Sequence, residues 1–193
     1  MFIMKNRNET KSDRILLIVI AALFAALVYV TTMLSIQMPR GNLNFGEACV
    51  LLSGLFVGPF GAVSAAIGAT LADITSGYII YAPATLLIKF LTAGCVCILY
   101  RVFKKIGGIG KLFKKKGSKP DAEAEKTAAR KNGIVSAIIA SILSEIIMVG
   151  GYYLYEIILS SSLAAAATTI PGNLVQALTG IVAAAIIFIL IPK

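Results

Sequence analysis

Apolar residues dominate six segments of this chain, and the stretches between them carry glycine, proline, asparagine and charged residues. A helix that crosses a bilayer needs about 20 mainly apolar residues. The pattern therefore predicts an all-α integral membrane protein, a six-transmembrane-helix bundle in which residues 1–193 form a single membrane domain. The second segment is short, so we expect it to be tilted or to span only part of the membrane. The predicted helices are Ile15–Ile36, Phe45–Phe56, Ala62–Ile74, Pro83–Tyr100, Ile134–Ile158 and Ile170–Ile191.

Composition and charge support this class and predict an orientation. Of the 193 residues, 58% are hydrophobic and 14% are charged, whereas about a quarter of a soluble domain is charged. Basic residues gather in residues 1–14 and in the polar stretch 101–132 between helices four and five. Lys and Arg stay on the cytoplasmic side of membrane proteins. We therefore expect both stretches and the C-terminus to be cytoplasmic (N-in/C-in), and interpret the basic loop as a topology signal rather than a nucleic-acid site.

Several polar residues fall inside the predicted spans, where a charge costs a few kcal/mol or more and is normally paired and functional. At a rise of about 1.5 Å per residue, four of them lie about 8–12 Å below the outer ends of their helices. These four are Asp73, Lys89, Tyr152 and Gln176. Three further residues, at or near the outer mouth, are Arg40, Asn44 and Glu47, and Asn173 lies one turn above Gln176.

This polar layer predicts a small-molecule pocket that opens to the outside, because ligand sites are apolar cavities with a few convergent polar groups. The alternative is structural: an Asp73–Lys89 ion pair that holds helices three and four together, with Tyr152 and Gln176 in ordinary interhelical hydrogen bonds. Glu145 is placed deeper, roughly 18 Å from the outer end of its helix. It is a candidate for a protonated acid, a pocket floor or a proton relay, and a purely structural role is equally open.

Small residues form a second pattern, on the first helix. Their spacing of four lets the backbones of two helices approach closely, either within the bundle or against another membrane protein. The residues are Ala21, Ala22, Ala25 and Ala26.

Enzyme signatures are missing from the sequence. The chain has no histidine, and its three cysteines have neither disulfide nor metal-site spacing. We find no phosphate-binding loop, serine-hydrolase elbow or zinc-protease motif. We therefore expect a non-enzymatic protein without a metal or cofactor.

A set of short motifs, in this order, resembles the substrate-binding S components of energy-coupling-factor (ECF) vitamin transporters. The motifs are ALFAAL in the first helix, NFGEA (44–48), GPFGA (58–62), ADITSGYIIYAPATLLIK (72–89) and IPGNLVQALTG (170–180). The resemblance implies a capture subunit in a prokaryotic plasma membrane that associates with a transmembrane coupling subunit and two ATPases. It assigns docking on the coupling subunit to the alanines of the first helix, and closure over the ligand to residues Gln37–Asn44.

Within that family, the stretch SGYIIYAPAT is most similar to the subgroup for hydroxymethylpyrimidine or pyridoxine-like vitamins, with riboflavin carriers as near relatives. Two other functions stay open. One is a self-sufficient transporter coupled to protons through Glu145 or Asp73, and the other is a structural membrane assembly protein whose charges only hold helices together.

Overall fold

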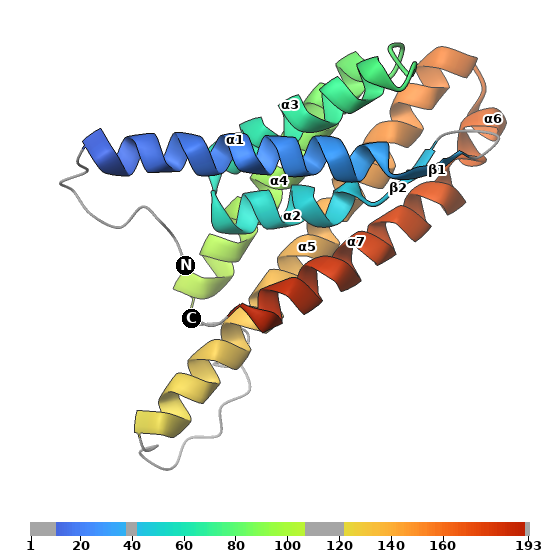
Figure 1. Cartoon of the computed structure of the whole chain (residues 1–193). Helices are drawn as coiled ribbons and strands as arrows, with labels where there is room; N and C mark the ends of the chain where they lie inside the picture. Colours follow the sequence, from blue (N-terminus) through green and yellow to red (C-terminus); the bar gives the residue numbers. More distant parts are fainter. Residues whose placement is uncertain (1–10, 38–41, 107–121, 192–193) are drawn as a thin grey trace.

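The computed structural model describes residues 11–37, 42–106 and 122–191. Within these ranges the chain forms helices and one small antiparallel hairpin (Figure 1). A helix covers most or all of each of the six predicted segments. The elements are α1 (Lys11–Met33), β1 (Ser35–Gln37), β2 (Asn42–Asn44), α2 (Gly46–Phe56), α3 (Pro59–Thr75), α4 (Ala82–Lys105), α5 (Ala122–Ser160), α6 (Leu163–Ala167) and α7 (Ile170–Leu190).

Helix length separates these elements into two groups. In the described part of the chain, four helical segments are long and apolar enough to cross a membrane: α1, α4, α5, and α6 together with α7. Helices α2 and α3 are apolar but shorter, with 11 and 17 residues. The protein is therefore a multi-pass helical membrane protein, while the full count of six crossings stays a prediction.

Several helix boundaries differ from the prediction, and one helix is additional. The first helix ends at Met33, because Ser35–Gln37 pairs with Asn42–Asn44 as a hairpin. Helix α5 begins at Ala122, inside the predicted polar loop, because the run from Ala122 to Lys131 is rich in strong helix formers such as Ala, Glu and Lys. The short helix α6 was not predicted; Ser162 caps it by accepting a 3.2 Å hydrogen bond from the Ala165 backbone N–H.

Helices α2 and α3 form a tight antiparallel pair. Gly58 turns the chain with φ +72°, a conformation that favours glycine, and Pro59 occupies the first turn of α3. A Cβ on Gly61 would lie 1.9 Å from the Ser53 carbonyl oxygen, so the backbones touch. The Ser53 hydroxyl also donates to the Gly61 carbonyl at 3.0 Å. Two short helices thus act as one packed unit.

Helix α1 packs on α3 through small residues, and this divides the alanines of the first helix. The Ser64 hydroxyl donates to the Ala21 carbonyl at 2.7 Å, and a Cβ on Gly68 would lie 2.3 Å from the Ala25 carbonyl. Ala21 and Ala25 are half-buried in this contact, whereas Ala22 and Ala26 are exposed. One alanine stripe serves internal packing, and the other remains accessible.

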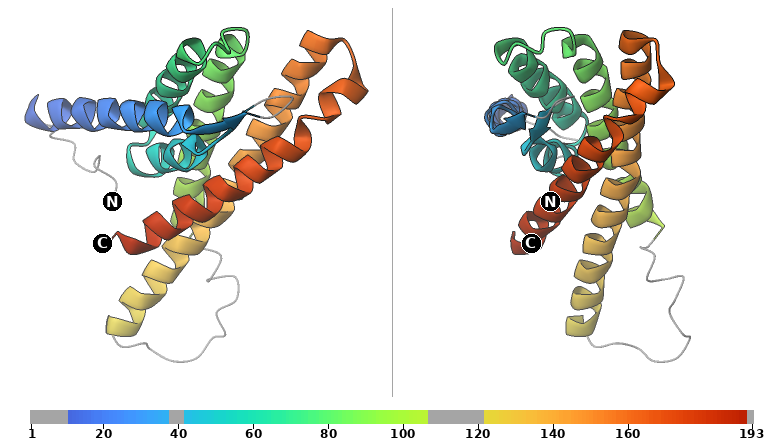
Figure 2. Two further views of the ribbon diagram at one scale, coloured as in Figure 1. Left: turned by 45° about the vertical axis from the view of Figure 1, so that its right-hand side comes forward. Right: turned by 90° about the vertical axis from the view of Figure 1, so that its right-hand side faces the viewer.

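The helices meet around an apolar core between α2, α4, α5 and α7. The Phe188 ring stacks on Phe56 at 5.6 Å between centroids and meets Tyr100 edge-on at 5.9 Å. Figures 1 and 2 show that α1 is steeply inclined to α5. The end of α4, the start of α5 and the end of α7 lie toward one end of the molecule, and the hairpin, the α3–α4 turn and α6 toward the other. The polar layer lies between these ends.

Candidate ligand-binding site

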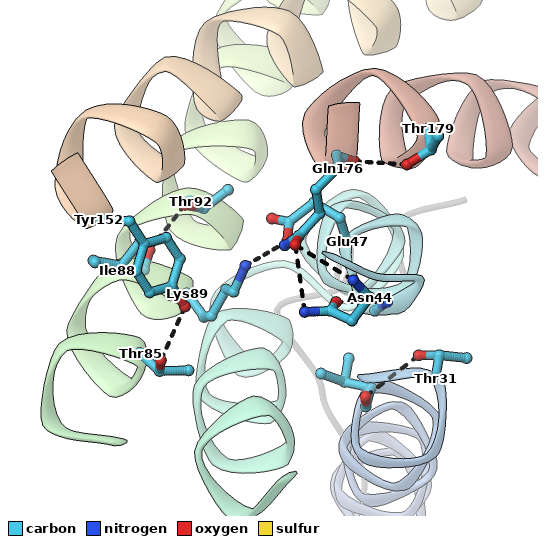
Figure 3. A network of polar contacts seen from close by, with 12 residues as sticks. Thr31, Asn44, Glu47, Thr85, Ile88, Lys89, Thr92, Tyr152, Gln176 and Thr179 are labelled. Carbon is cyan, nitrogen blue, oxygen red and sulfur yellow. Dashed lines mark hydrogen bonds and ion pairs between the residues drawn. The ribbon is translucent and has the colours of Figure 1, made fainter. Parts of the chain in front are cut away.

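A buried ion pair forms the centre of the site. The ammonium of Lys89, on α4, binds Oε2 of Glu47, in the first turn of α2 (Figure 3). Lys89 is 3% exposed and Glu47 is 0% exposed. The partner of Lys89 is therefore Glu47, and not Asp73 as the structural alternative had it. Glu47 also lies within the layer rather than at its mouth, because the close α2–α7 packing carries it inward.

Gln176 links this pair to the hairpin. Its Nε2 donates to Oε2 of Glu47 at 3.2 Å, and its Oε1 accepts from both the backbone N–H and Nδ2 of Asn44 at 3.5 Å. Asn44 ends β2, and its Oδ1 accepts a 3.0 Å hydrogen bond from the Gly46 backbone N–H at the start of α2. A continuous polar path therefore runs from Lys89 to the hairpin.

Tyr152, on α5, provides an aromatic wall beside the ion pair. The Lys89 nitrogen lies 5.2 Å from the centre of the Tyr152 ring, within the range of a cation–π contact. The Tyr152 hydroxyl shares a 2.9 Å hydrogen bond with Thr85 Oγ1, one turn before Lys89 on α4. The ring is therefore held in place at its hydroxyl end while its face lies against the ammonium, as Figure 3 shows.

The other predicted residues are less central. Asp73 is half-buried near the end of α3 and interacts with Thr85 and Lys89. Asn173 is half-buried one turn before Gln176. Arg40 lies outside the described residues. The structure thus brings Asn44, Glu47, Lys89, Tyr152 and Gln176 together, with Asp73 and Asn173 at the border.

Glu145 lies on α5 below this network and is 3% exposed. It interacts with Glu47 and Lys89, yet within the described ranges neither of its carboxyl oxygens receives a hydrogen bond. The sequence placed it deeper than the other residues, near mid-membrane, and the structure brings it next to the ion pair.

Aromatic residues connect the start of α4 to the end of α5. The Tyr81 hydroxyl donates to Glu156 at 2.9 Å, and the Tyr155 hydroxyl donates to the Ile80 carbonyl. Burial, assisted by the contact with Glu156, raises the pKa of Tyr81 to about 12, so its hydroxyl remains a donor. The wall of the site formed by α4 and α5 is therefore held together at the end where α4 starts and α5 ends.

Two residues of the site were missed in the sequence. Thr85 precedes Lys89 by four positions, so helical spacing places both on one face and is the signal that could have identified it. Gly180 follows Gln176 by four positions, and a Cβ there would lie 2.6 Å from the Glu47 Cβ. A glycine on the face of a polar layer is a weaker signal, since its role is to admit a neighbouring side chain.

Comparisons with known proteins agree with this architecture. A family model described as "ECF-type riboflavin transporter, S component" matches residues 12–118, a stretch that holds Glu47, Asp73 and Lys89. A solved structure of the S component of a bacterial ECF transporter is similar with a TM-score of 0.50 and 19% sequence identity, over 92% of this chain and 93% of that chain. At this identity the likeness establishes the fold. A search of curated proteins found no match.

Proposed function

The chain belongs to the family of ECF-type riboflavin transporter S components, and on this basis we propose that it captures a water-soluble vitamin for import, with riboflavin as the first candidate. S components are transport subunits of membrane complexes, not enzymes. The sequence motifs favoured hydroxymethylpyrimidine or pyridoxine-like vitamins, and the family match moves riboflavin ahead of them.

The buried network around Lys89 is the observation that carries this proposal. It offers an ammonium and amide groups as donors, a carboxylate as acceptor and the ring of Tyr152 as an aromatic surface. Riboflavin has a flat heteroaromatic ring with carbonyl and imide groups and a polyhydroxyl chain. A few convergent polar groups in an apolar wall suit such a ligand. Asp73, Glu145 and Asn173 border the network, and we propose them as further ligand-binding residues.

The hairpin is proposed to close over the ligand. The two contacts from Asn44 to Gln176 are 3.5 Å long, beyond the usual 2.7–3.2 Å of such bonds. Weak contacts of this kind are easily replaced when a ligand offers better partners. Ligand entry between Asn44 and Gln176 would therefore break only these two long hydrogen bonds.

The decisive experiment is a titration of the purified, ligand-free chain with riboflavin, followed by quenching of the vitamin's fluorescence and by thermal shift. A ligand at a hundredfold excess over its Kd stabilises the folded state by about 2.7 kcal/mol. Glu47→Gln should abolish binding, and Lys105→Met, at an exposed position on α4, should leave it unchanged. Absence of binding to riboflavin, hydroxymethylpyrimidine and pyridoxine alike would contradict the proposal.

Import also needs partners, and we propose that the exposed stripe of Ala22 and Ala26 docks on the coupling subunit of a complex with two ATPases. Ala22→Leu with Ala26→Leu should leave vitamin binding intact and abolish co-purification with the coupling subunit. Ala25→Leu, a matched change in the α1–α3 contact, should instead lower the unfolding temperature. If the exposed pair left assembly intact, the docking surface would have to lie elsewhere.

We further propose six membrane crossings in the plasma membrane, with residues 1–14, residues 101–132 and the C-terminus in the cytoplasm. Exposed basic residues at one end of the molecule support this: Arg101, Lys104, Lys105, Arg130 and Lys131. Single cysteines introduced at Lys105 and at Ile79 should react with an impermeant thiol reagent from opposite sides of the membrane. Labelling of both from one side would reject this topology.

A second function, proton-coupled transport without partners, is favoured by the buried carboxyl of Glu145, which receives no hydrogen bond from the described part of the chain. It predicts uptake of the vitamin into liposomes that contain this chain alone and carry a proton gradient. The S-component proposal predicts no uptake there until the coupling subunit and ATPases are added.

A further inference from the structure

Three buried carboxyl oxygens in the polar layer receive no hydrogen bond from the residues that the structure describes. They are both oxygens of Glu145 and Oε1 of Glu47. The two residues are 3% and 0% exposed, so water does not satisfy them from the surface. An orphaned buried acceptor is costly. This cost is reduced if one carboxyl carries a hydrogen and donates it to the other, because only one of the three oxygens then stays without a hydrogen bond.

The charges around these oxygens also indicate that one of the two carboxyls is protonated. Helix α2 contributes Glu47, α4 contributes Lys89, and α7 contributes the neutral Gln176. Helix α5 contributes Glu145 and Tyr152, and Asp73 of α3 lies at the half-buried border, interacting with Lys89 and Tyr152. With both glutamates ionised, the buried centre would hold two negative charges against one ammonium.

Glu145 interacts with both Glu47 and Lys89, and two neighbouring carboxylates disfavour joint ionisation. Lys89 already binds Oε2 of Glu47, and Gln176 donates to the same oxygen, so Glu47 is stabilised as the ionised partner. Glu145 receives no hydrogen bond from any described residue, which makes it the carboxyl that holds the proton. We propose that Glu145 and Glu47 share one proton in the ligand-free protein, donated by the Glu145 carboxyl toward Oε1 of Glu47.

This shared proton leaves the buried centre with no net charge, since the Lys89 ammonium balances the one remaining carboxylate. The proton also joins α5 to α2, two helices that no other hydrogen bond of the network connects among the described residues. The inference concerns the protein without ligand and is independent of which vitamin it binds.

Infrared spectroscopy of the full chain in detergent, without ligand and at neutral pH, tests the proposal. A protonated carboxylic acid has a carbonyl stretching band, separate from carboxylate bands, that shifts in heavy water. We expect such a band in the unmodified protein. It should disappear in Glu145→Gln and in Glu47→Gln, since the remaining carboxylate pairs with Lys89, and it should persist in Asp73→Asn, the matched control at the border of the layer.

Circular dichroism checks that each variant is folded, and either glutamate variant suffices if the other fails to fold. Absence of the band from the unmodified protein overturns the proposal without any variant. A band that survives Glu145→Gln or Glu47→Gln, or that is lost in Asp73→Asn, assigns the proton to another residue and overturns it as well. Riboflavin binding takes no part in this experiment, so its failure and that of the proposed function are distinguishable.

Discussion

Replacing Lys89 with methionine tests the electrostatics of the site most directly. Methionine keeps most of the side-chain volume and removes the charge, so Glu47 loses its buried counter-ion. A carboxylate that is 0% exposed and unpaired is too costly to keep. We therefore expect the folded variant to hold Glu47 in its neutral form, while the unfolded chain still ionises it.

The predicted loss of stability follows from this difference in the ionisation of Glu47 between the folded and unfolded states. Glutamate in an unfolded chain has a pKa of about 4.3, and each pH unit above this value is worth about 1.36 kcal/mol. At about pH 7 the ionisation of Glu47 therefore stabilises the unfolded state of the variant by about 3.7 kcal/mol. For a domain of this size, 1 kcal/mol corresponds to about 2–4 °C, which predicts a fall in Tm of about 7–15 °C. Glu47 of the variant is neutral when folded, so its penalty grows as pH rises above about 4.3 and vanishes below it.

The assay is thermal unfolding of the purified protein in detergent, at about pH 7.5 and about pH 5, since the penalty should shrink between them. Lys89→Met combined with Glu47→Gln should lose less stability than Lys89→Met alone, because glutamine does not have to bind a proton. Lys105→Met, at an exposed position, is the control. An equal loss at both pH values, or losses of the two single variants that add in the double variant, would refute the buried pair.

Three further predictions concern neighbouring positions. Gly180→Ala places a Cβ 2.6 Å from the Glu47 Cβ. Thermal unfolding should therefore show a loss of stability of about 1–3 kcal/mol, and titration with riboflavin should show a weaker affinity. Gly150→Ala, with open space around it, should change neither the stability nor the affinity. Tyr81→Phe removes the hydrogen bond to Glu156 and should cost about 0.5–1.5 kcal/mol, equally at about pH 6 and about pH 9, because the pKa of Tyr81 is about 12. Glu145→Gln should raise Tm at neutral pH and have little effect near pH 4, about the pKa of free glutamate, because glutamine carries its hydrogens without binding a proton; an unchanged Tm at neutral pH would contradict the shared proton.

The sequence alone was enough to identify the class of protein and the approximate positions of its long apolar helices, but not the early start of α5 or the short helix α6. Length and continuity of apolar segments are local properties, and the bilayer demands about 20 apolar residues per crossing. The predicted second helix, Phe45–Phe56, and the last, Ile170–Ile191, agree with α2 and α7 to within one residue at each end. The motifs also indicated the transporter family, which the family match confirms.

The partners of the polar residues were decided only by the tertiary structure. Lys89 and Glu47 are 42 positions apart. No local sequence pattern predicts the orientation of α2 about its axis or its position relative to α4. Depth along a helix predicted that Lys89 and Asp73 share a level, but side-chain direction and close backbone contacts decided the pairing. Gly180 admits the Glu47 side chain, and Gly68 admits the backbone at Ala25, which places Ala22 and Ala26 outside. Apolar length is encoded within each segment, whereas ion pairs and exposed faces depend on how the segments pack against one another.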